Sequence, residues 1–126
     1  MSRSLRIIFQ VHAIVSAILG VLLLVSPGRF LGLFGWAPVD PILSRLLGAA
    51  FLALAWASYR GGRATEESQV AILVELEAVF CVLASLGILR HLVVAVWPWY
   101  VWLLFAGFVA WAIVWIYELV AIRRSG

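Results

Sequence analysis

Two carboxylates, Glu75 and Glu77, lie within a long apolar segment at residues 70–89. A charged side chain inside a lipid bilayer is costly, so such acids are usually paired, hydrated or functional. Carboxylates at this depth can carry protons or bind a cation, and they can also hold neighbouring helices together through hydrogen bonds. Glu75 and Glu77 are therefore the first candidates for a functional site.

His12, Arg45 and Glu118 are polar side chains in three other apolar segments. With a helical rise of about 1.5 Å per residue, we expect His12 about 10 Å and Glu118 about 6 Å from one membrane edge. On the same scale, Glu75 and Glu77 lie about 8 and 11 Å from that edge. One half of the membrane is therefore expected to hold a histidine and three carboxylates, whereas Arg45 lies in the other half.

Helical geometry prevents Glu75 and Glu77 from pointing the same way. Residues two apart are separated by about 200° around a helix axis. Glu75 shares its face with the small residues Ala78 and Ser85, and Glu77 shares its face with Cys81. One glutamate can thus face the protein interior, while the other meets a second subunit or a water-filled path, or is neutral and protonated at the lipid.

The two basic side chains inside the membrane each allow two interpretations. Arg45 either extends its side chain to the nearby headgroups or forms an ion pair with Glu77. His12 either hydrogen-bonds a neighbour such as Glu118 or Glu75, or ligates a haem or chlorophyll through its imidazole. We expect the hydrogen-bonded histidine and no cofactor, with axial ligation as the alternative.

The composition is that of a membrane protein with one domain, residues 1–126. Hydrophobic residues make up 66% of the chain and charged residues 12%, compared with about 25% charged residues in soluble domains. A soluble protein of this size lacks the volume to bury so many apolar side chains.

The charge and the single cysteine exclude several classes of protein. The net charge is +3, but no basic patch with interleaved aromatic residues lies outside the apolar segments, so nucleic-acid binding is not expected. Cys81 is the only cysteine, which excludes an intramolecular disulfide and a cysteine-based metal site.

The apolar segments predict an all-α, integral membrane four-helix bundle with an up-down-up-down arrangement. The expected spans are approximately residues 5–25, 41–59, 70–89 and 98–122. Each has about the 20 residues needed to cross a hydrocarbon core of about 30 Å. Asp40 and Pro41 predict a capped start of the second span, and Thr65 is expected to cap the third. The apolar segment 27–40 is expected to lie in the membrane interface.

Arginines predict the orientation of the spans. Those on the side of the two termini are Arg3, Arg6, Arg60, Arg63, Arg123 and Arg124. The opposite side has Arg29 and Arg90, with Arg45 just inside the membrane. Because positive residues collect on the cytoplasmic side, both termini are expected in the cytoplasm of a cell with a bacterial-type inner membrane.

Small residues predict where the helices pack. Ala49, Ala53 and Ala57 recur every four residues on the second span, and Gly107 and Ala110 lie on the fourth. Small side chains let membrane helices approach closely. We therefore expect these faces to form helix contacts.

The sequence offers no catalytic motif. A Gly-rich phosphate loop, His-Glu-x-x-His, Gly-x-Ser-x-Gly and paired cysteines are all missing from it, so no enzyme is expected. The leading expectation is a non-catalytic accessory subunit or homo-oligomer, whose intramembrane polar residues set packing and partner choice. Its partners would be the lipid bilayer and other membrane subunits or itself. The alternative is a small proton- or cation-coupled transporter or channel that uses Glu75 or Glu77.

Overall fold

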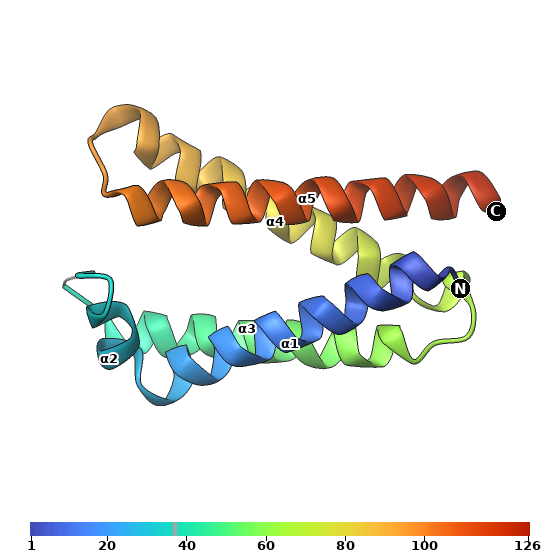
Figure 1. Cartoon of the computed structure of the whole chain (residues 1–126), viewed down its shortest axis with the longest axis horizontal. Coiled ribbons are helices and arrows are strands. Elements are labelled where there is room, and N and C mark those ends of the chain that lie inside the picture. The colour runs from blue at the N-terminus through green and yellow to red at the C-terminus, as the bar shows by residue number, and fades with distance from the viewer. Residues whose placement is uncertain (37) are drawn as a thin grey trace. The chain divides into compact units, whose positions relative to one another are not determined.

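The computed structural model describes residues 1–36 and 38–126, and its regular structure is entirely helical. The elements are α1 (Arg3–Val25), α2 (Pro27–Gly32), α3 (Pro41–Gly62), the 3-10 turn η1 (Glu67–Gln69), α4 (Ala71–Val94) and α5 (Trp99–Ser125). Four of these helices, α1, α3, α4 and α5, are long and apolar enough to cross a membrane. The chain divides into two compact units, Met1–Thr65 and Glu66–Gly126 (Figure 1).

The helix starts depend on local capping. Ser2 caps α1, where its side chain accepts a hydrogen bond from the backbone N–H of Leu5. Asp40 caps α3 as expected, accepting from two backbone N–H groups, with Pro41 at the first helical position. The prediction that Thr65 caps the third span is wrong, because η1 intervenes and α4 begins only at Ala71. A turn at η1 satisfies the backbone there through its own hydrogen bonds.

The predicted interfacial segment 27–40 contains the short helix α2 and a turn. Gly35 in this turn has φ 72°, in the left-handed region that favours glycine. Leu33 and Phe34 are exposed beside it. Ala37 of the predicted segment lies outside the described residues.

Helices α1 and α3 form an antiparallel hairpin with a close backbone contact (Figure 1). A Cβ atom built on Gly48 would lie 2.7 Å from the backbone N of Leu24 and 2.8 Å from the backbone O of Gly20. One built on Gly20 would lie 2.9 Å from the backbone O of Gly48. Only glycine therefore fits where the two helices cross, and small residues of this kind allow tight packing in a bilayer.

The hairpin does not use the face of α3 that the alanine spacing predicted. The side chains on its buried face belong to Phe51, Ala55 and Ser58, whereas Ala49 and Ala53 are exposed. Residues 49 and 53 lie roughly opposite the buried face by helical geometry. Gly107 on α5 is likewise exposed, and a Cβ atom there would meet nothing within 4 Å.

Helices α4 and α5 form the second hairpin. Two contacts set its register: the Ser125 hydroxyl donates to the Glu67 carboxylate at 3.1 Å, and the rings of Phe80 and Phe108 meet edge to face at 6.0 Å. The buried residues of α4 recur three or four apart, as expected for one helix face: Val74, Glu77, Ala78, Cys81, Ser85 and Leu92. This face carries one of the two candidate glutamates.

We expect Gly48→Ala to lower the free energy of unfolding by about 1–3 kcal/mol, because the added methyl group overlaps backbone atoms of α1. Denaturant unfolding in lipid bicelles measures the change. Gly107→Ala is the matched control, since its methyl group enters open space. Its stability should stay unchanged or rise by up to about 1 kcal/mol through helix propensity. Equal losses in both variants would contradict the close contact.

Candidate functional site

His12 lies in a buried polar cluster between α1 and α3. A hydrogen bond of 2.9 Å joins its Nδ1 to the Ser58 hydroxyl, and the Ser16 hydroxyl lies 3.4 Å from the ring. His12 is 6% exposed and Ser58 is fully buried. Because hydrogen bonds between membrane helices favour one arrangement, this cluster helps to hold α1 against α3.

The two partners of His12 within the hairpin are serines that the sequence did not single out. Ser16 follows His12 by four residues on the same face, and this spacing was the available signal. Ser58 gave no such signal, because its proximity follows from the register of α1 and α3. Hydrogen bonds from His12 to Glu118 or Glu75 would join residues of different units. They stay predictions, as does ligation of a haem or chlorophyll by His12.

Glu77 and Glu118 are both buried, with 1% and 3% of their surface exposed. Both belong to the second unit, Glu77 on α4 and Glu118 on α5. Carboxyl groups enclosed in this way can hydrogen-bond across a helix pair and hold it in register. Glu77 is thus the glutamate that faces inward.

Glu75 points outward and forms an ion pair with Arg123, at 3.3 Å between Oε1 and Nη2. The side chains are 55% and 66% exposed, respectively. Glu75 lies one turn after the start of α4, and Arg123 lies in the last turn of α5. An exposed pair of this kind contributes about 0–1 kcal/mol to stability.

Arg45 lies at the end of the first hairpin that is far from Met1. Its Nε donates a hydrogen bond of 3.2 Å to the carbonyl of Leu24, in the last turn of α1. The carbonyls of a last helical turn have no partner within their helix, so this bond satisfies one of them. The alternative pairing of Arg45 with Glu77 connects the two units and stays a prediction.

Trp111 of α5 stacks on Trp115, with ring centroids 6.1 Å apart and planes inclined by 25°. Trp115 is fully buried. Offset stacking of two aromatic rings is a favourable packing arrangement. These rings therefore have a structural role in the second hairpin.

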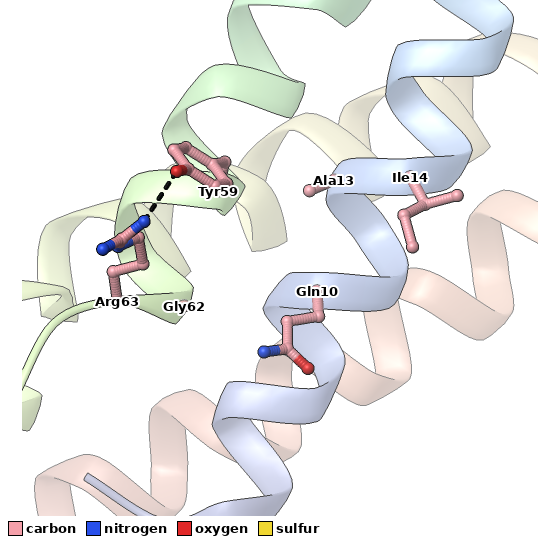
Figure 2. Close-up of a pocket in the computed structure, with 6 residues that line it drawn as sticks. All are labelled: Gln10, Ala13, Ile14, Tyr59, Gly62 and Arg63. Carbon is pink, nitrogen blue, oxygen red and sulfur yellow. Dashed lines mark hydrogen bonds between the residues drawn. The ribbon is translucent and has the colours of Figure 1, made fainter.

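A depression of about 430 Å³ opens between α1 and α3 (Figure 2). Its lining residues are Gln10, Ala13, Ile14, Tyr59, Gly62 and Arg63. Within it, Nη1 of Arg63 donates a hydrogen bond of 2.8 Å to the Tyr59 hydroxyl, and the guanidinium lies 5.7 Å from the centre of that ring. Sequence reasoning treated Arg63 only as an orientation signal, because the depression depends on the pairing of two distant segments.

Comparisons of the chain with models of known families, with curated proteins and with solved structures find no match. Over residues 1–36 and 38–126, no group of three or more His, Cys, Asp or Glu side chains could hold a metal ion. The candidate site residues divide between the two units: His12 and Arg45 belong to the first, and Glu75, Glu77 and Glu118 belong to the second.

We expect Ser58→Ala to lower the free energy of unfolding by about 0.6–1.7 kcal/mol, the range for side-chain hydrogen bonds between membrane helices. Denaturant unfolding in bicelles again measures the change. Ser44→Ala is the control, because Ser44 is on the same helix and its side chain takes part in none of the hydrogen bonds of the described residues. A loss no larger than that of the control would show that the bond to His12 is dispensable.

Proposed function

We propose that this protein is a non-catalytic structural subunit of a membrane assembly, formed with other membrane proteins or with further copies of itself. The observation that carries the proposal is the exposed small-residue face of α3, with Ala49 and Ala53 exposed and Ala57 half-buried. Large aliphatic side chains pack well against lipid tails, whereas small residues four apart favour a second helix.

Both faces of α3 are suited to helix contacts. Its buried face uses Gly48 to approach α1 closely, and the Ala49–Ala53 face lies roughly on the opposite side. A helix with small residues on two opposite faces can be packed between two others. The exposed Glu75–Arg123 pair on the second hairpin adds a polar group that a partner subunit can recognise.

The polar groups of the spans support a structural role more than transport. His12 and Ser58 bond each other across α1 and α3, and Glu77 and Glu118 are buried. A proton- or cation-coupled transporter, the alternative, needs a water path to Glu75 or Glu77. The residues that line the depression in the first hairpin include no carboxylate.

The arginine distribution supports an orientation within this proposal. We propose that the protein lies in a cell inner membrane with both termini in the cytoplasm, because six arginines flank the spans on that side.

We expect Ala53→Leu to weaken the assembly about tenfold, equal to about 1.4 kcal/mol, because the larger side chain separates the helices. Native mass spectrometry of protein gently extracted from its own membrane measures the fraction in complexes. Ala53→Ser is the matched control, since serine is also small and should preserve the complex. Monomers in all three proteins, or an intact complex with Ala53→Leu, would overturn the proposal.

The orientation is tested by single cysteines in a Cys81→Ala background. Ser68→Cys lies in the exposed connection before α4, and Gly28→Cys lies in α2 on the other side. With both termini in the cytoplasm, a membrane-impermeant maleimide should label Gly28→Cys in intact cells and Ser68→Cys only in inverted vesicles. The reverse pattern would show the opposite orientation.

A further inference from the structure

We propose that the depression between α1 and α3 binds an anionic glycerophospholipid, with the phosphate of its headgroup at Arg63 and Gln10 and the start of an acyl chain along Ala13 and Ile14. This is a binding site separate from the assembly face of α3. It lies at the end of the hairpin where the chain begins (Figure 2).

The charge of the first unit selects an anion at this end. Arg3, Arg6, Arg60 and Arg63 all lie at the end that holds the depression. The only acidic residue between Met1 and Thr65 is Asp40, and it caps α3 at the far end. Basic groups at a helix end attract anionic lipids at about 1 kcal/mol per residue. The next carboxylates along the chain, Glu66 and Glu67, accept hydrogen bonds from Ser68 and Ser125.

The donors that would hold the phosphate come from both helices. The Tyr59 hydroxyl accepts from one nitrogen of Arg63 at 2.8 Å and so fixes the guanidinium at the rim. A guanidinium has five N–H donors, so several stay available for a phosphate. Gln10 lies on α1, across the depression from Arg63 (Figure 2). Among the described residues, its side-chain amide takes part in no hydrogen bond.

The order of polar and apolar residues matches the order of groups in a lipid. Arg63 ends α3, and Gln10 precedes Ala13 and Ile14 along α1 toward the middle of the span. Gln10, Ala13 and Ile14 share one helix face because they are three and four residues apart. Moving from the helix end into the membrane, a ligand therefore meets charge, then an amide, then aliphatic surface. A free phosphate ion would leave the aliphatic part unused.

Gly62 keeps the depression open at its floor. A Cβ atom on Gly62 would lie 3.5 Å from Cβ of Phe9 and 3.6 Å from Cγ of Gln10, which are ordinary contacts. Alanine therefore fits there without moving the helices, whereas a leucine side chain would extend into the space. The adjacent Gly61 differs, because a Cβ atom there would lie 2.8 Å from the Phe9 ring. Position 62 thus allows the depression to be filled while Arg63 is kept.

The test is a titration of the whole protein in neutral detergent, followed by native mass spectrometry. The probes are dioleoyl phosphatidylglycerol, dioleoyl phosphatidylcholine and sodium phosphate. We expect phosphatidylglycerol to bind about fivefold more tightly than phosphatidylcholine, and Arg63→Gln to weaken it about fivefold. Arg60→Gln is the matched control, because it removes the same charge from the same helix outside the depression. It should weaken binding less than about twofold.

A second pair of variants tests whether filling the depression blocks lipid binding while the charge of Arg63 is kept. Gly62→Leu should abolish phosphatidylglycerol binding with Arg63 intact, and Gly62→Ala should retain it, with helicity by circular dichroism as the check on folding. Equal binding of the two lipids, or equal losses with Arg60→Gln and Arg63→Gln, would overturn the site. Displacement of the lipid by sodium phosphate at equal concentration would identify a free-phosphate site instead and also overturn it. If Gly62→Leu fails to fold, the site is tested by comparing phosphatidylglycerol binding to the Arg63→Gln and Arg60→Gln variants.

Discussion

The close approach of α1 and α3 at Gly20 and Gly48 is the constraint on which the first hairpin depends. In a bilayer, lipid tails are as apolar as leucine, so the hydrophobic effect gives little reason for two helices to associate. Association then needs van der Waals contact between backbones, which a single added methyl group at Gly48 would prevent. The same contact sets the register that brings His12 to Ser58, and it creates the depression between Gln10 and Arg63 farther along.

The second hairpin, α4 and α5, packs through larger side chains than the first. Its buried face includes Trp115, Glu77 and Glu118, and the stacked indole of Trp111 extends this packing. Polar groups away from water must find partners within the protein. Moving these carboxylates to a position that faces lipid would therefore be costly. The first hairpin thus has a close backbone contact at glycines, whereas the second has larger buried side chains.

Much of the helical structure could be predicted from composition and local signals, whereas the contacts could not. Long apolar segments predicted all four helices that are long and apolar enough to cross a membrane, and the Asp40–Pro41 cap was predicted correctly. Thr65 failed as a cap because η1 satisfies the intervening backbone by itself. The helical separation of Glu75 and Glu77 predicted that only one faces inward, but its identity depends on how α4 meets α5. Spacing alone likewise could not distinguish the Ala49–Ala53 face of α3 from its buried face.

Helix α3 has three surfaces that differ in their chemistry. One face is committed to α1 through Gly48 and Ser58. The opposite face is small and exposed, which lipid covers poorly and a helix covers well. The end is basic, and Arg63 is held there by Tyr59 beside an aliphatic surface. Because these surfaces do not overlap, α3 can keep its contact with α1 while a partner helix and a lipid headgroup occupy the other two. This separation of surfaces is what the proposed structural subunit would need in order to contact several membrane components at once.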